Sequence, residues 1–314
     1  MSDTTLLILD RDAEIYRRAV AAAYPQVRII ATTSKDEALA AAGEADILAA
    51  VGHALDEPLG AALRGLKWVQ ALSTGVDGVT RIQSLPKDII LTSARGAHGP
   101  QMAEMAFAHM LSLTRQVPRF VHNQDNRRWE RWPQAMLHGK TVVIVGTGFI
   151  AGELAARCKA FGLTVKGVTH TVRPVEHFDE ILPRTALKAA LGEADYAILL
   201  LPLDDSSRNL FDAEMIAAIK PGGFLINLAR GGIVDEGALA RALQSGSLAG
   251  AGLDVFAAEP LPVDSPLWAT PNLLITPHVG GLSETYAQQV SPILVANLGA
   301  YLAGRPQDMI NRWA

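Results

Sequence analysis

The chain has 314 residues, 49% of them hydrophobic and 19% charged, and at roughly 150 residues per domain this length predicts two domains with large cores. A net charge of −4 excludes the basic field that binds phosphate backbones, and a single cysteine, Cys158, excludes the disulfide-rich secreted class. No apolar run reaches the roughly 18 residues of a membrane span, and the acidic N-terminus, MSDTTLLILDRD, does not resemble a signal peptide, so we expect a cytoplasmic protein without membrane or nucleic-acid partners.

Along the chain, short β-branched or leucine-rich runs alternate with alanine-rich segments of helical period. This alternation predicts βαβ units and an α/β fold with doubly wound parallel sheets. Most of the runs are apolar throughout, as strands covered on both faces are. The predicted strands are residues 6–9, 27–30, 46–50, 68–72, 89–92, 141–145, 164–168, 197–201, 224–227, 252–255 and 273–275.

The tetrapeptide Gly-Glu-Ala-Asp occurs twice, at residues 43–46 and 192–195. Each copy stands between an alanine-rich segment and an apolar strand. The repeat suggests two similarly wound α/β halves that meet near residue 97, and chance is the alternative explanation.

Two long helices are predicted outside these halves. Residues 99–119 form a helical pattern that is broken only near Pro118 and would connect the halves, and residues 283–304 form another that would pack back on the first half. We therefore expect two domains: residues 1–97 completed by 284–314, and residues 98–283.

A glycine-rich turn follows the predicted strand 141–145, in the run V-G-T-G-F-I-A-G. Gly146, Gly148 and Ala151 occupy the places of a G-x-G-x-x-A fingerprint between a strand and a helix. The glycines permit a tight turn and allow backbone N–H groups to approach a pyrophosphate at the positive end of the helix. The motif predicts a dinucleotide site, and a glycine turn without a ligand is the alternative.

The acidic residue that usually holds the ribose 2′-hydroxyl of NAD is absent from the end of the next predicted strand. Hydroxyls and positive charge stand there instead, in Thr169, His170, Thr171 and Arg173. Because a carboxylate would repel a 2′-phosphate and an arginine can pair with it, the sequence favours NADP over NAD. The alternative is that His170 and Arg173 are exposed loop residues.

Three later segments place ionisable residues just after a predicted strand, at the edge where open α/β sheets bind ligands. These residues are Arg230, Asp254 with Glu259, and His278. Each alone has a structural explanation. Together they predict an anion clamp, a base-orienting acid and a proton carrier close to the glycine-rich turn.

With these motifs in order, the chain resembles the D-isomer-specific 2-hydroxyacid dehydrogenase family almost from end to end. The resemblance rests on V-G-T-G-F-I-A-G at 145–152, N-L-A-R-G-G-I-V-D-E-G-A-L at 227–239, G-L-D-V-F-A-A-E-P-L at 252–261 and T-P-H-V-G-G at 276–281. It implies two Rossmann-like domains with a cleft between them, the first binding substrate as a lid and the second binding the dinucleotide.

The resemblance implies a role for each catalytic residue. Arg230 would bind the substrate carboxylate and polarise the keto oxygen, and His278 would deliver the proton. Glu259 would orient the imidazole and favour its protonated form. The backbone N–H groups of Thr74, Gly75 and Val76 would bind the substrate carboxylate from the first domain.

The resemblance also implies cofactor contacts, with Asp254 binding the nicotinamide amide. No metal is expected. The other predicted cofactor contacts are Gly146, Thr147, Gly148, Phe149, Ile150, Thr169, His170, Thr171, Arg173, Pro202, Leu203, Ser207, Ala229, His278 and Gly280.

Two departures from the family pattern bear on specificity. The missing ribose-binding acid makes the chain similar to the NADPH-linked glyoxylate and hydroxypyruvate reductase branch, with NAD as a possible cofactor. Arg95 and His98 stand in the S-A-R-G-A-H-G loop, where many members have an asparagine. They would line the substrate mouth or serve as hinge or interface residues.

Residues 124–132, QDNRRWERW, are polar with two tryptophans, which suits either a solvated loop or a subunit contact. The resemblance suggests a homodimer that uses this stretch. We expect hydride transfer between NAD(P)H and a small, anionic 2-keto acid. The alternatives are a formate- or phosphite-type dehydrogenase of the same fold and a non-catalytic, dinucleotide-sensing corepressor-like protein.

Overall fold

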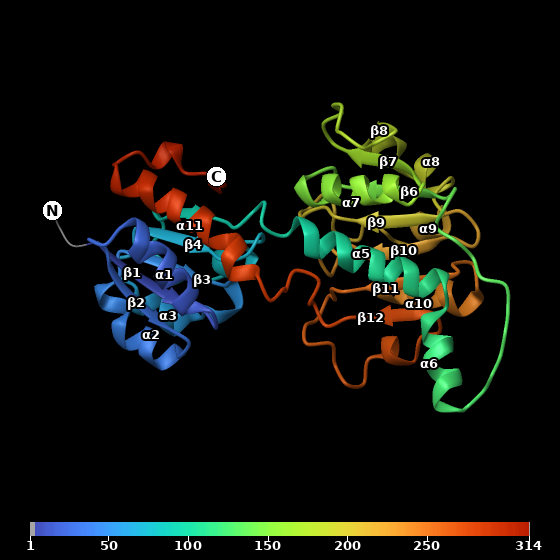
Figure 1. Ribbon diagram of the computed structural model, residues 1–314, viewed down its shortest axis with the longest axis horizontal. Helices are drawn as coiled ribbons and strands as arrows, with labels where there is room; N and C mark the ends of the chain where they lie inside the picture. The colour runs from blue at the N-terminus through green and yellow to red at the C-terminus, as the bar shows by residue number, and fades with distance from the viewer. Residues whose placement is uncertain (1–3, 314) are drawn as a thin grey trace. The chain divides into compact units, whose positions relative to one another are not determined.

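The computed structural model, which describes residues 4–313, contains two parallel β-sheets with helices on both faces of each. The predicted fold class is therefore confirmed. The chain divides into two units (Figure 1), with unit 1 running to His98 and again from Ser283, and unit 2 comprising Gly99–Leu282. None of the helices within residues 4–313 has the length and apolar character needed to cross a membrane.

Unit 1 is built on a five-stranded sheet in the order β2-β1-β3-β4-β5. Its strands are β1 (Thr5–Leu9), β2 (Arg28–Thr32), β3 (Ile47–Ala50), β4 (Trp68–Ala71) and β5 (Ile90–Thr92). Its helices are α1 (Ala13–Ala23), α2 (Lys35–Ala41), α3 (Glu57–Ala62), α4 (Asp77–Thr80) and α11 (Tyr286–Leu302).

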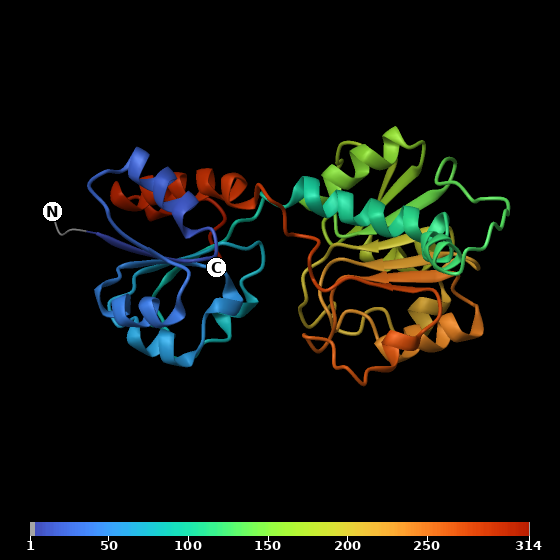
Figure 2. The same cartoon turned by 60° about the horizontal axis from the view of Figure 1, so that its bottom comes forward.

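Alternate residues of β1 divide the core of unit 1 into two layers. Leu6 and Ile8 pack with α1 and α11, whereas Leu7 and Leu9 pack with α2 and α3. The turned view shows the two helical layers on opposite faces of the sheet (Figure 2). Because both faces are covered, β1 is buried at every position and is apolar from Leu6 to Leu9, the stretch that the sequence pattern predicts as a strand.

Unit 2 is built on a seven-stranded sheet in the order β12-β11-β10-β9-β6-β7-β8. Its strands are β6 (Thr141–Val145), β7 (Thr164–Thr169), β8 (Glu180–Pro183), β9 (Tyr196–Leu199), β10 (Phe224–Asn227), β11 (Gly250–Leu253) and β12 (Leu273–Ile275). Its helices are α5 (Gly99–Thr114), α6 (Val117–Asp125), α7 (Phe149–Ala160), α8 (Leu187–Leu191), α9 (Ala213–Ala217) and α10 (Glu236–Ser245).

The strand order of unit 2 reverses between β6 and β9, and open α/β sheets bind ligands at the carboxyl ends of strands at such a point. Helices α5 and α7 cover one face of this sheet, and α8, α9 and α10 cover the other. Both layers are visible in Figure 2. The glycine-rich turn after β6 therefore stands at the binding edge of the sheet.

The structure differs from the predicted elements in two places. Strand β8 was not predicted, because this edge strand is half exposed and contains a glutamate and a proline instead of an apolar run. The helix predicted over residues 99–119 ends earlier, at Thr114. Gln116 adopts a left-handed backbone, φ 54°, and α6 begins at Val117, so Pro118 lies in the first turn of a new helix.

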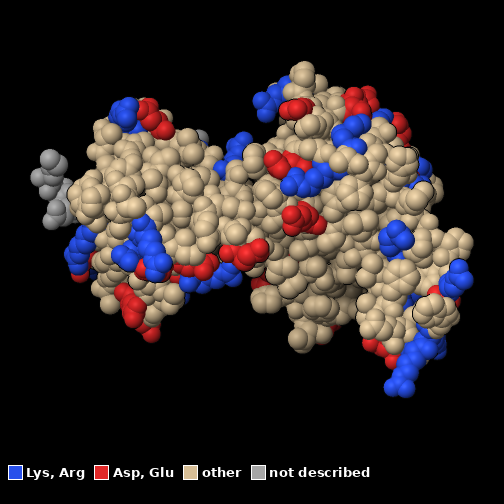
Figure 3. Space-filling view, in the orientation of Figure 1, with Lys and Arg blue, Asp and Glu red and all other residues tan. Residues whose placement is uncertain are grey.

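Helix α6 and the irregular residues 126–136 form an arm on unit 2. Trp132 packs against Phe120 and beneath the Arg119 guanidinium, which lies 3.9 Å from its ring centre. Trp129, by contrast, is 95% exposed. Lys and Arg side chains gather over this region in the lower right of Figure 3. The arm thus combines an anchored aromatic side chain with an uncovered one.

The repeated Gly-Glu-Ala-Asp segments occupy equivalent places in the two units. The Asp46 carboxylate accepts the N–H of Thr5 at 3.0 Å, and the Asp195 carboxylate accepts the N–H of Thr141 at 2.9 Å. Each aspartate thereby binds the first residue of the first strand in its sheet, β1 or β6, and also pairs with a lysine. The repeat reflects the same βαβ winding in both units.

Replacing Asp195 with asparagine should destabilise the protein at neutral pH. Burial by itself would raise the pKa of Asp195, but the hydrogen bonds from Lys220 and the Thr141 N–H lower it overall. A carboxylate whose pKa is lowered by folding contributes its full stability above its ordinary pKa of about 3.9, and this stability is lost as pH falls through the folded pKa. We expect a loss of about 1 kcal/mol in urea unfolding at pH 7.

The same comparison at pH 3 should give a smaller difference, because below the ordinary pKa of about 3.9 the unfolded carboxyl takes up a proton that the folded Asp195, with its lowered pKa, binds less readily. The exposed Asp264→Asn variant is the control and should match wild type at both pH values. An Asp195→Asn penalty that stayed constant with pH would contradict this account.

Candidate active site

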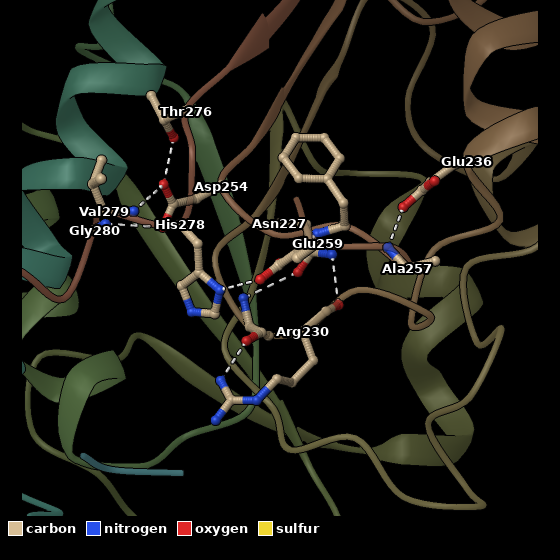
Figure 4. Close-up of polar contacts among 12 residues, drawn as sticks. Asn227, Arg230, Glu236, Asp254, Ala257, Glu259, Thr276, His278, Val279 and Gly280 are labelled. Atoms are coloured by element: carbon tan, nitrogen blue, oxygen red, sulfur yellow. Dashed lines mark hydrogen bonds and ion pairs between the residues drawn. The ribbon is translucent and has the colours of Figure 1, made fainter. Parts of the chain in front are cut away.

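The candidate site lies at the carboxyl edge of three neighbouring strands of unit 2. Arg230 follows β10, Asp254 directly follows β11, and His278 follows β12. Because these strands are parallel neighbours, their ends meet at one edge of the sheet. Figure 4 shows the three side chains and Glu259 extending from this edge. The tertiary structure thus assembles residues that are up to 48 positions apart in the sequence.

Glu259 and His278 form a close pair, with Glu259 Oε2 2.7 Å from His278 Nδ1. A carboxylate only accepts hydrogen bonds, so Nδ1 carries the hydrogen, and Nε2 stays available for proton exchange. The other carboxylate oxygen, Oε1, accepts the N–H of Phe256 at 2.9 Å, which fixes the glutamate. The imidazole is 48% exposed, so its outer edge is open to a reactant.

The loop that carries Arg230 is shaped by a buried asparagine. Asn227 Oδ1 accepts the N–H of Ala229, and its Nδ2 donates to the carbonyl of Arg230 at 2.9 Å. The guanidinium Nη1 donates to the Ala229 carbonyl at 2.7 Å (Figure 4). The half-buried side chain is therefore held at the sheet edge.

The Arg230 and Glu259 loops touch backbone to backbone, which explains a glycine in the motif. A Cβ added to Gly231 would lie 1.9 Å from the Phe256 carbonyl, so no larger residue fits there. Glu236 braces the same loop, because its Oε1 accepts the N–H of Ala257 at 2.7 Å. The loops that carry Arg230 and Glu259 are therefore held together by direct packing.

Asp254 is buried and holds the loop that carries His278. Its carboxylate accepts the Thr276 hydroxyl at 2.5 Å and the N–H groups of Val279 and Gly280 at 3.1 and 2.9 Å. His278 has a left-handed backbone, φ 52°, which is uncommon for residues other than glycine. The contacts on both sides of His278 maintain this conformation.

The glycine-rich turn has the geometry that a dinucleotide pyrophosphate needs. Gly146 adopts φ 99°, and a Cβ there would lie 2.7 Å from the Leu200 carbonyl. A Cβ on Gly148, the N-cap of α7, would have no atom within 4 Å, so space is open before the helix. The first N–H groups of a helix lack intrahelical acceptors and lie at its positive end, so this turn fits a dinucleotide.

The other predicted cofactor contacts occupy the same edge of unit 2. Thr169 ends β7, and His170, Thr171 and Arg173 are exposed immediately after it. Ser207 is buried, and its hydroxyl donates to the Pro202 carbonyl and accepts the N–H of Asp204, so it shapes the loop after β9. The remaining ones are Thr147, Ile150 and Leu203, half-buried; Phe149, exposed; and Ala229 and Gly280, buried.

The predicted substrate loop lies in unit 1, between β4 and α4. The hydroxyl of Thr74 is 2.5 Å from His98 Nδ1, and the His98 ring packs against Tyr286 with ring centres 4.8 Å apart. The hydroxyl of Ser73 closes the turn by donating to the Gly75 carbonyl, and Val76 is buried. His98 therefore contacts the predicted substrate loop.

The structure adds four residues that sequence reasoning missed: Asn227, Glu236, Thr276 and His109. All four support loops at the site through hydrogen bonds, and His109 reaches Thr276 from α5 at 3.1 Å. Asn227, Glu236 and Thr276 stand inside the motifs that carry the family resemblance, and His109 is a histidine within the apolar pattern of residues 102–111, but the sequence analysis assigned none of them a role. No group of three or more metal-ligating side chains within residues 4–313 is placed to hold a metal ion.

Comparisons with known proteins identify the family of this chain. A model of the NAD-binding domain of D-isomer-specific 2-hydroxyacid dehydrogenases matches residues 107–280. The chain is 33% identical over 282 residues to the D-3-phosphoglycerate dehydrogenase of Mycobacterium bovis, covering 89% of this chain and 53% of that protein. The chain therefore spans about half the length of this curated relative.

Solved structures match over the whole chain. A D-isomer-specific 2-hydroxyacid dehydrogenase family protein from Aeromonas salmonicida has a TM-score of 0.92 and 38% identity, covering 100% of this chain and 99% of its own. An NADPH-dependent glyoxylate/hydroxypyruvate reductase from Sinorhizobium meliloti, solved with NADP and sulfate, has a TM-score of 0.85 and 27% identity, with 99% and 98% covered. With its glycine-rich turn and its Arg, Glu and His at one sheet edge, this chain belongs to the D-isomer-specific 2-hydroxyacid dehydrogenase family.

Proposed function

We propose that the protein reduces a small 2-keto acid to a D-2-hydroxy acid with NADPH and catalyses the reverse oxidation. The observation that carries this proposal is the Glu259 and His278 pair, 2.7 Å apart, at the same sheet edge as Arg230 and the glycine-rich turn. A proton carrier and a fixed cation next to a dinucleotide site are the groups that carbonyl reduction requires.

When bound, the cofactor supplies the hydride. His278 donates the proton from Nε2 to the substrate carbonyl oxygen, since Nδ1 is engaged by Glu259. Glu259 stabilises the protonated imidazole by its negative charge and holds its orientation. In the oxidative direction the same nitrogen accepts the proton from the hydroxyl group.

Arg230 binds the substrate carboxylate through its planar fork, which pairs with two oxygens at once. Its positive charge also polarises the keto group. We further propose that the N–H groups of Thr74, Gly75 and Val76 bind the substrate carboxylate. Glyoxylate and hydroxypyruvate are the proposed substrates, because the Sinorhizobium meliloti relative is named for both.

The His278→Asn variant tests the proton carrier. Asparagine tolerates a left-handed backbone, so the fold should persist, but its amide cannot deliver a proton near neutral pH. With NADPH and glyoxylate or hydroxypyruvate, we expect kcat to fall by about 10²-fold or more, the usual scale for a general acid. Fluorescence titration should show NADPH affinity within a few-fold of wild type.

His177 provides a matched control, because it is also an exposed histidine of unit 2 with a left-handed backbone, φ 68°. His177→Asn should leave kcat unchanged. Near-normal turnover in His278→Asn would remove His278 from this role, and a wild-type enzyme inactive on every small 2-keto acid would refute the proposed reaction.

NADP is the proposed preferred cofactor, with NAD as the weaker one. The support is local: Thr169, His170, Thr171 and Arg173 follow β7 with no carboxylate among them, and the side chain of Arg173 is exposed. A guanidinium there attracts a 2′-phosphate and gains nothing from a free ribose hydroxyl. The Sinorhizobium meliloti relative was solved with NADP.

The Arg173→Ala variant should raise KM for NADPH by about 10-fold, the equivalent of one charge-assisted hydrogen bond at an exposed site, and should barely change KM for NADH. Arg64→Ala, an exposed arginine of unit 1, is the control and should change neither. Equal losses with both cofactors, or wild-type preference for NADH, would contradict the NADP assignment.

A homodimer through the arm of unit 2 is the proposed assembly. Trp129 is 95% exposed and Met136 63%, and arginines 127, 128 and 131 are exposed close to Trp129. Tryptophan, methionine and arginine are the residue types enriched in protein interfaces. An uncovered tryptophan costs free energy in water, which a second copy of the chain would recover by burying it.

The Trp129→Ala variant should weaken the dimer by about 30-fold in Kd, the scale of an interface tryptophan, as measured by sedimentation across a concentration series. Trp313→Ala removes another half-exposed tryptophan, from unit 1, and should leave the assembly unchanged. A monomeric wild type, or equal behaviour of both variants, would exclude this interface.

A further inference from the structure

A fully buried histidine with no assigned role stands behind the site. His109 lies on α5, where its neighbours on the buried face are apolar, and its ring packs against β11 at Gly252. A Cβ at position 252 would lie 2.1 Å from His109 Nδ1, so only glycine leaves room for the ring. The two residues fit each other, although neither is part of the proposed reaction.

Hydrogen bonding determines which nitrogen of His109 carries the hydrogen. Thr276 donates its hydroxyl hydrogen to Asp254 Oδ1 at 2.5 Å, so it can only accept from His109 Nε2, 3.1 Å away. His109 is therefore the Nε2–H tautomer, and its Nδ1 is a buried acceptor without a partner. Burial lowers the pKa of His109, although the negative charge of Asp254 acts to raise it. The lowered pKa keeps the ring neutral.

The chain of contacts continues from Asp254 to the loop that carries His278. Asp254 accepts the N–H groups of Val279 and Gly280, and His278 donates its own N–H to the Thr276 carbonyl at 3.0 Å. Figure 4 shows Thr276, Val279 and Gly280 arranged around this one carboxylate. Hydrogen bonds to Asp254 therefore hold the loop 276–280 on both sides of His278. His109 donates to Thr276 and is the first residue of this chain of contacts.

We propose that His109 is a positioning residue that acts through Thr276 and Asp254 to hold the His278 imidazole against Glu259. The proposal rests on the proposed function, in which His278 carries the proton. His109 fixes the Thr276 hydroxyl, and the hydroxyl orients the Asp254 carboxylate toward two backbone N–H groups. Helix α5, a long element packed against α7 and the sheet, thereby becomes the rigid base of the catalytic loop.

The test compares two substitutions at position 109. His109→Leu keeps the apolar bulk and removes the donor, whereas His109→Gln retains an N–H donor that can reach Thr276. For the leucine variant we expect kcat to fall about 10-fold with little change in KM, because a small displacement of a proton carrier slows the reacting step. The glutamine variant should recover to within about 3-fold of wild type.

Thr114→Val is the matched control, because Thr114 also makes a buried hydrogen bond from α5, but its partner is Tyr196 and not the Thr276 and Asp254 pair. It should reduce stability without lowering kcat. Equal kcat losses in Thr114→Val and His109→Leu would show a general effect of loosening α5 and would overturn the proposal.

Hydrogen exchange separates this inference from the proposed function. In His109→Leu, the backbone amides of Val279 and Gly280 should exchange about 10-fold faster than in wild type, and in His109→Gln they should stay protected. This readout needs no activity, so it holds even if the proposed substrates fail. Unchanged exchange in the leucine variant, or no recovery with glutamine, would refute the role of His109.

Discussion

A parallel sheet needs crossover connections that return each strand to the same starting edge, and both units of this protein obey that constraint. Helices cover both faces of each sheet, so the interior strands are mostly apolar. All carboxyl ends then meet at one edge, where polar side chains can reach water and ligands. The candidate site of unit 2 lies at that edge because helices cover both faces of the sheet.

Several polar side chains at this edge shape the backbone instead of facing a ligand. Asp254 and Glu236 accept N–H groups from a neighbouring loop, whereas Asn227 and Ser207 each accept an N–H group within their own loop. These contacts within unit 2 hold Arg230 and the histidine loop in place. Because each buried N–H group needs an acceptor, these polar side chains fix the loops that carry the site residues.

The paired aspartates show that the two units share more than strand order. Asp46 and Asp195 each join the start of the first strand of a sheet to a lysine, although unit 1 carries no glycine-rich turn after β1. One unit keeps its first βα turn for a dinucleotide fingerprint, and the other has the sequence L-D-R-D there. Equivalent folds therefore offer different chemistry, because function depends on the loops and not on the sheet.

The sequence alone determined the fold class, most strand positions and the motifs at the sheet edge, because apolar period and glycine spacing are local properties. Strand β8 was not predicted, because an exposed edge strand needs no apolar run. The family resemblance already implied that Glu259 pairs with His278, and the structure places their atoms 2.7 Å apart. Only the tertiary structure decided that Gly231 must be a glycine and that His109 reaches Thr276. These contacts join segments that are distant in the sequence. Local patterns in a single sequence give no distances between side chains on different strands.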